Sequence, residues 1–250
     1  MAIDDPRPED CLAPTAYLDS DHPDVSGMAE RVCREAGATS DRDRAVALFL
    51  AVRDGIRYDP YAVSGDPAWY RASSIMHEPA AYCIPKAVLL SATCRAVGIP
   101  ARLGFADVRN HLQSAKLRER MGTDVFAFHG YSELWLAGRW LKVSSAFNRD
   151  LCDRFGTQVL EFDGETDALM HAFDRAGNRH MEYVRDRGSY ADLPFDEIMA
   201  GFAEVYGQMD DYAATTPTGS TRDETFEPVT RPPTACAPVT GGPSVDEAPT

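Results

Sequence analysis

The sequence has few lysines and little basic charge to gather into one surface. Only three of its 25 basic residues are lysines, and 39 acidic residues give a formal net charge of −14 at pH 7. Nucleic acids and anionic lipids are bound through clustered Lys and Arg, so this balance excludes a surface built to follow phosphates. We therefore expect neither nucleic acid nor a membrane among the partners.

Long apolar runs and paired cysteines are also missing. No apolar segment reaches 18 residues, and the opening MAIDDPRPEDCLAP is acidic where a signal peptide would be basic and then apolar. The six cysteines form no C-x-x-C pair, and a chain of 250 residues does not need disulfides to fold. The sequence thus predicts a cytoplasmic protein with reduced thiols, no structural zinc and no cofactor.

The chain divides into three parts by composition. Residues 1–22 read as an irregular segment, and residues 23–212 as one domain, since 44% apolar residues suffice for a core. Residues 213–250 are rich in proline and threonine and have almost no large apolar side chains. Such a segment buries too little to offset its ordering entropy, which predicts a disordered tail.

Helical periodicity dominates the first hundred residues. Apolar side chains at helical spacing predict a helix from Val25 to Ala36, and Ser40 with Asp43 predicts the cap of a second one that ends at Gly55. Residues 57–70 read as a loop. Residues 84–97, IPKAVLLSATCRAV, are apolar on nearly every side and precede Gly98, which predicts a buried helix.

Strand patterns follow that helix. Residues 99–108, 128–136 and 139–144 read as strands, and Ala137-Gly138 suits a tight hairpin turn between the last two. Beyond Phe162 the chain reads as an acidic loop, until Pro194 opens a further helix. Helices that lead into an antiparallel sheet predict the α+β class, with the buried helix packed on the sheet.

Cys83 lies where a thiol can be activated. Pro85 fits only the first turn of a helix, so the buried helix starts near residue 84 and puts Cys83 at its cap. Unpaired N–H groups at a helix N-terminus favour a thiolate and can also hold an oxyanion. The alternative is a small buried hydrophobe, which is how we interpret Cys94, three turns further along.

A catalytic cysteine needs a base, and His129 is the candidate among the six histidines because a rigid strand would hold it. A two-residue turn at Ala137-Gly138 pairs Tyr131 with Ser144, which makes His129 and Ser144 diagonal neighbours on one face. A structural, hydrogen-bonding histidine is the alternative. Glu133 falls opposite Lys142 and reads as a solvated ion pair.

Two segments together carry a family resemblance. AYCIPKAVLLSATCRAVGIPARLGF resembles the cysteine motif of the transglutaminase-like superfamily, and FHGYSELWLAGRWLKVSSAFN resembles its histidine hairpin. The similarity covers roughly residues 40–150 and implies a papain-like α+β fold with Cys83 as nucleophile and His129 as base. Ser144 stands where the family's aspartate is expected. Asn148 could orient His129 instead, as an amide does in related cysteine proteases.

Other candidates surround this pair. Tyr82, beside the nucleophile, and His111, after the first strand, are possible substrate-side residues. Asp163, Asp167 and His171 recur at four-residue intervals and could form a metal site on a helix, but Asp163-Gly164 also suits a turn, so we expect no metal. His180 has no evident partner.

These patterns favour acyl transfer on an amide or peptide bond through a Cys83 thioester, with hydrolysis more favoured than crosslinking. Ser144 keeps a second interpretation open, namely a catalytically decayed domain that serves as a binding or scaffold module. A metal-dependent role for residues 163–171 is a third.

Overall fold

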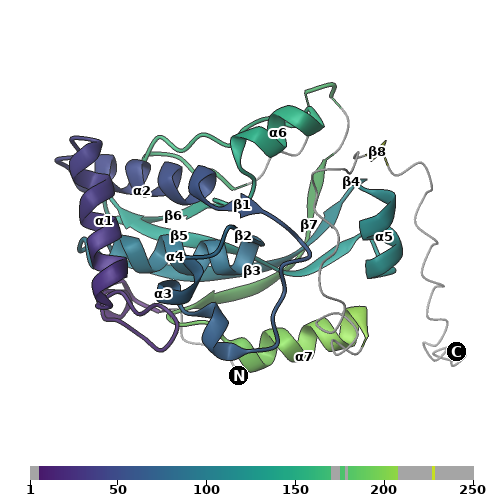
Figure 1. Cartoon of the computed structure of the whole chain (residues 1–250), viewed down its shortest axis with the longest axis horizontal. Helices are drawn as coiled ribbons and strands as arrows, with labels where there is room; N and C mark the ends of the chain where they lie inside the picture. Colours follow the sequence, from purple (N-terminus) through teal and green to yellow (C-terminus); the bar gives the residue numbers. More distant parts are fainter. Residues whose placement is uncertain (1–5, 170–174, 178–179, 208–226, 229–250) are drawn as a thin grey trace, which may run out of the picture.

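The computed structural model describes residues 6–169, 175–177, 180–207 and 227–228, and it is built on one antiparallel sheet (Figure 1). Four strands lie in the order β6-β5-β3-β7. Their bounds are β3 (Ala101–Asn110), β5 (Val125–Leu136), β6 (Arg139–Val143) and β7 (Met181–Tyr190). The predicted α+β class is confirmed. Apart from residues 227 and 228, the predicted disordered tail lies outside the described residues.

Helix α4 (Cys83–Ala96) forms the centre of the core. Every residue from Cys83 to Arg95 is buried, because α4 packs on β5 and β3 while α1 (Pro23–Glu35), α2 (Asp41–Gly55) and α3 (Ala72–Ile75) cover it. Figure 1 shows α4 crossing in front of the sheet, with α1 to its left and α2 above it. The apolar run predicted this burial on all sides.

The predicted cap of α2 and the predicted left-handed glycine after α4 are confirmed. The Ser40 hydroxyl accepts from the Asp43 N–H and the Asp43 carboxylate accepts from the Ser40 N–H, which caps α2 reciprocally. Gly98 follows α4 with φ +84°, a left-handed conformation that a glycine adopts without strain.

Shorter elements complete the described chain. Residues 57–70, predicted as loop, contain one strand and one 3-10 helix, and α5 and α6 were not predicted. These elements are η1 (Pro8–Cys11), β1 (Arg57–Tyr58), η2 (Pro67–Tyr70), β2 (Ala80–Ala81), β4 (Leu112–Gln113), α5 (Ala115–Met121), α6 (Arg149–Phe155), α7 (Phe195–Tyr206) and β8 (Glu227–Pro228). None of the described helices is long and apolar enough to cross a membrane.

Strand β7 corrects the expectation of a loop beyond Phe162. It pairs antiparallel with β3 along the edge of the sheet, and two register shifts interrupt the ladder. An edge strand keeps one side in solvent, so charged residues are tolerated and Tyr183 and Val184 remain about half exposed. The exposure and the bulges together remove the period-two pattern by which a strand is recognised.

The hairpin of β5 and β6 has the predicted register. Leu136 pairs with Arg139, and Ala137 and Gly138 both have positive φ, as a two-residue turn of this kind requires. Glu133 does pair with Lys142, in register and as an ion pair, but the expected solvent exposure of its carboxylate is wrong. Glu133 is 2% exposed, and its carboxylate accepts from the Arg102 Nε at 2.5 Å, while the Lys142 Nζ lies 3.9 Å away.

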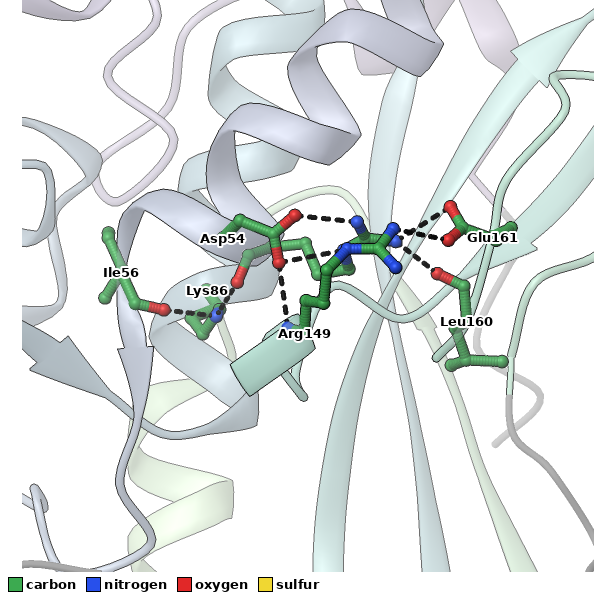
Figure 2. A network of polar contacts seen from close by, with 7 residues as sticks. Asp54, Ile56, Lys86, Arg149, Leu160 and Glu161 are labelled. Atoms are coloured by element: carbon green, nitrogen blue, oxygen red, sulfur yellow. Dashed lines mark hydrogen bonds and ion pairs between the residues drawn. The ribbon is translucent and has the colours of Figure 1, made fainter. Parts of the chain in front are cut away.

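A buried lysine ties α4 to α2. Lys86 is fully buried, and its Nζ donates to the carbonyl oxygens of Arg53 at 2.8 Å and Ile56 at 2.5 Å, at the C-terminal end of α2. Figure 2 shows this contact beside the ion pair of Arg149 with Glu161 and the hydrogen bond that the Arg149 backbone N–H donates to Asp54. Burial lowers the pKa of Lys86 to about 7. Since Cys83 lies one turn earlier on α4, these two hydrogen bonds also fix the start of that helix.

Candidate active site

Cys83 opens helix α4. Tyr82, with an extended backbone, is the residue that caps the helix, so the helix starts one residue earlier than predicted while the thiol stays at its N-terminus. Burial raises the pKa of the Cys83 thiol to about 11, and the backbone N–H groups of Gly130 and Ile84 oppose this shift by favouring the thiolate. Desolvation therefore outweighs the helix terminus.

Gly130 allows β5 to approach the start of α4. A Cβ atom on Gly130 would lie 3.0 Å from the Cα of Ile84 and 3.1 Å from its Cγ1, which is closer than side chains normally pack. The missing side chain thus lets the Gly130 N–H reach the Cys83 sulfur. Sequence reasoning did not single out Gly130, although a glycine inside a strand pattern often marks a close approach of this kind.

His129 lies directly before Gly130 on β5 and pairs with Ala106 of β3. Its side chain is 5% exposed, and burial lowers its pKa to about 4. The ring Nε2 is buried and has no hydrogen-bond partner among the described residues. A buried polar atom without a partner is unusual in a folded protein and is often found where function requires it.

A strained residue aims His129. Phe128 has a positive φ of 51°, and the ladder between β3 and β5 slips by one residue between Ala106 and Val108. The Phe128 N–H donates to Asp107 Oδ1 at 3.1 Å, and Arg187 donates twice to that carboxylate, at 2.9 and 2.8 Å. The Arg187 guanidinium also lies over the Phe128 ring. These contacts hold the bulge from which His129 projects.

The Cys83 and His129 side chains line one cavity of about 490 Å³. Its other walls come from the loop after β1, from α5, from the start of β5 and from α7, and most of them are apolar. The structure therefore brings the two predicted catalytic residues to a shared space. Tyr82, one of the two predicted substrate-side residues, also lines this cavity, and its hydroxyl lies 2.9 Å from that of Tyr70.

A second cavity of about 340 Å³ lies on another side of His129 and is also lined by Ser144 and His180. Ser144 follows β6 directly, and its N–H donates to the Ala168 carbonyl at 2.8 Å. His180 stacks on Phe147 with ring centroids 6.1 Å apart. The structure thus places Ser144 near His129 as predicted, with no hydrogen bond between their side chains among the described contacts. It adds His180, for which the sequence offered no signal.

Two predicted site residues lie elsewhere. The Asn148 side chain accepts from the Tyr58 N–H at 3.0 Å and so anchors β1, and no described hydrogen bond links it to His129. His111 lies 3.3 Å from a Glu182 carboxylate oxygen, at the end of β3, and lines neither cavity. Both residues were predicted site residues because they follow a motif or strand closely in the sequence. Their actual places depend on the turn after β6, for Asn148, and on the length of β3, for His111.

The acidic stretch after Phe162 forms a turn. Asp163 Oδ1 accepts from the N–H groups of Glu165 and Thr166 at 2.8 Å each, and Asp167 accepts from the Lys142 N–H at 3.0 Å. These carboxylates thus serve the backbone, as the turn interpretation predicted. His171 lies outside the described residues. Within the described ranges, no group of three or more His, Cys, Asp or Glu side chains could hold a metal ion.

The electrostatics favour a neutral thiol beside a neutral imidazole. Burial disfavours the charged form of both groups, and no carboxylate is positioned to offset an imidazolium within the described part of the site. The described cysteines, residues 11, 33, 83, 94 and 152, are all buried. Cys83 lines the first cavity with His129, and Cys152 lines the second cavity with His129 and His180. Cys83 differs from Cys152 because it is the first residue of its helix.

Comparison with known proteins finds similarity over the part of the chain that contains this site. Residues 28–145 match the model of the transglutaminase-like superfamily. No curated protein matches the chain significantly. A solved structure, "The Crystal Structure of a Putative Cysteine Protease from Cytophaga hutchinsonii", aligns at 18% identity with a TM-score of 0.40, over 72% of this chain and 52% of that one, so this chain spans about half its length. Residues 28–145, which include Cys83 and His129, are therefore similar to the transglutaminase-like superfamily.

Proposed function

We propose that this protein transfers the acyl group of an amide or peptide through a thioester on Cys83, with His129 as general base and acid. One observation carries the proposal: the thiol at the start of α4 and the imidazole of His129 line the same cavity. A nucleophile and a base that share a cavity are the minimum for covalent acyl transfer.

Each step uses groups of this site. The Cys83 sulfur attacks the carbonyl carbon while its proton passes to His129, and N–H groups at the first turn of α4 stabilise the oxyanion. The C–N bond then breaks as His129 returns the proton to the departing amine. Water, deprotonated by His129, attacks the thioester, releases a carboxylic acid and restores the thiol. We propose water as the acceptor, so that the net reaction is hydrolysis.

The neutral resting pair sets the character of this chemistry. A thiol with a pKa of about 11 and an imidazole with a pKa of about 4 do not form an ion pair, so proton transfer must accompany the attack. Ser144, in the place of the expected aspartate, can orient His129 but cannot offset its positive charge. We therefore expect a slow enzyme, active on reactive amides or under the influence of a bound substrate.

The same electrostatics favour a second candidate, a binding module that retains the fold. A cavity with a buried thiol and a weakly basic imidazole can still receive a peptide group without cleaving it. In that case ligands would bind beside Cys83 and leave unchanged.

The deciding experiment is a search for the thioester. The protein is incubated with N-acetyl amino acid p-nitroanilides, quenched in acid, and Cys83 is examined by intact-protein and peptide mass spectrometry. We expect an acyl adduct on Cys83 in the wild type, none in Cys83→Ser, and an unchanged adduct in Cys33→Ser, a control at a cysteine with the same 7% exposure. His129→Gln should slow adduct formation. Binding without any adduct would support the binding module.

A further inference from the structure

The cavity beside Cys83 has almost no polar lining. Among the described residues that line it there is no Asp, Glu, Lys or Arg, and the walls include Val63, Met121, Phe126, Phe128 and Phe202. Its volume of about 490 Å³ includes the solvent at its open mouth, so the space beside Cys83 and His129 can be reached from outside. Such a space can receive a side chain in addition to the reacting carbonyl.

The tyrosine hydroxyls at its border are largely committed to the protein. The Tyr82 hydroxyl is 2.9 Å from that of Tyr70, and the Tyr206 hydroxyl accepts from the Ala127 N–H at 2.6 Å and donates to the Val125 carbonyl at 3.3 Å. Tyr58 presents a ring that packs edge-on against Phe147. Apart from the Cys83 thiol and the His129 ring, this lining offers little to which a polar ligand group could bind.

We propose that this cavity selects the acyl side of the substrate and accepts a bulky apolar side chain, aromatic or branched aliphatic, in preference to a carboxamide or a charged group. The inference rests on the proposed function only in calling the bound molecule a substrate. The cavity would select ligands in the same way if they were bound without turnover. A glutamine or glutamate side chain would lose its hydration there without gaining partners. Each methylene buried against the walls instead strengthens binding about fourfold.

The test is equilibrium binding to the folded Cys83→Ser protein, which cannot form the thioester. The probes are N-acetyl-L-phenylalaninamide, N-acetyl-L-leucinamide and N-acetyl-L-glutaminamide. Binding of each is measured by NMR titration of the isotope-labelled protein. We expect the two apolar amides to bind about tenfold or more tightly than the glutamine amide, with shifts at α5, α7 and the start of β5.

Two substitutions locate the selectivity. Val63→Glu places a carboxylate at the half-buried wall and should reduce binding of the phenylalanine amide about tenfold or more. Val184→Glu, at a position about half exposed on β7 and away from this cavity, should leave binding unchanged. Circular dichroism and thermal unfolding verify that both variants are folded.

The outcomes separate the two proposals. Equal or tighter binding of the glutamine amide, or no binding of the apolar amides up to their solubility limits, overturns the apolar pocket. Selective binding of the apolar amides with no thioester in the wild type supports the pocket and refutes the acyl-transfer proposal. Thioesters formed equally from glutamine and phenylalanine donors refute the pocket and support acyl transfer.

Discussion

The buried state of Cys83 predicts an unusual pH dependence of its alkylation. Burial raises the pKa of its thiol from an ordinary value of 9.0 to about 11. Iodoacetamide reacts with the thiolate, so native Cys83 should react more slowly than the same cysteine in the urea-unfolded chain.

The size of the effect follows from two opposing changes. A shift from 9.0 to about 11 reduces the thiolate fraction near neutral pH about a hundredfold. A more basic thiolate is also more nucleophilic, by about eightfold if reactivity follows pKa with a slope near 0.45. Ionisation alone therefore slows native Cys83 about tenfold, and its 7% exposure slows it further.

The pH profile separates ionisation from shielding. Rates are measured from pH 7 to 10 by peptide mass spectrometry, for native and urea-unfolded protein. The rate at native Cys83 should rise tenfold per pH unit without a plateau, whereas the unfolded chain should level off near pH 9. Cys94, fully buried within α4, is an internal control that should stay unlabelled while the protein is folded.

One result would refute the reasoning. If alkylation of native Cys83 reached a plateau below pH 8, and if His129→Gln abolished that reactivity, the resting site would contain a thiolate and an imidazolium. The neutral pair derived from burial would then be wrong, and the catalytic assignment of both residues would gain strength.

Four further predictions concern the surroundings of this pair. Ser144→Asp supplies a carboxylate near His129, so it should raise the pKa of the imidazole and speed the alkylation of Cys83 at pH 7 about tenfold. Ser144→Ala should leave the rate of alkylation unchanged, and the two variants are compared by measuring that rate. His129 has a folded pKa of about 4, below its ordinary 6.5, so the unfolded chain takes up the proton first and stability falls as the pH is lowered through this window. Urea titrations should show a loss of about 2 kcal/mol between pH 7 and 4.5 in the wild type and not in His129→Gln. Lys86 has a folded pKa of about 7, below its ordinary 10.5, so its burial should make stability rise by about 2 kcal/mol from pH 7 to 8.5, a gain that Lys86→Met should lack in urea titrations at both pH values. Gly130→Ala pushes β5 from α4 and should destabilise the fold by about 1–3 kcal/mol, with loss of thioester formation at Cys83, and a stable, active variant would contradict the close approach.

Features that depend on neighbouring residues could be predicted from the sequence. The Ser40 cap of α2, the end of α4 before Gly98 and the hairpin register around Ala137-Gly138 each depend on a few adjacent positions, so local rules suffice. The apolar run of α4 also predicted that this helix is buried on all sides, and the predicted start of the helix made Cys83 the candidate nucleophile. The register then predicted that Ser144 would approach His129.

Features that depend on residues distant in sequence were decided by the tertiary structure. Arg102 donates a hydrogen bond to the buried carboxylate of Glu133, and packing brings His180 and Ser144 to one cavity. The residues next to them in the sequence indicate neither contact. Strand β7 escaped prediction because an exposed edge imposes no alternation. Most of all, the charge states of Cys83 and His129 follow from burial. A helix N-terminus predicts a lowered thiol pKa, but desolvation by the surrounding chain reverses the sign of the shift.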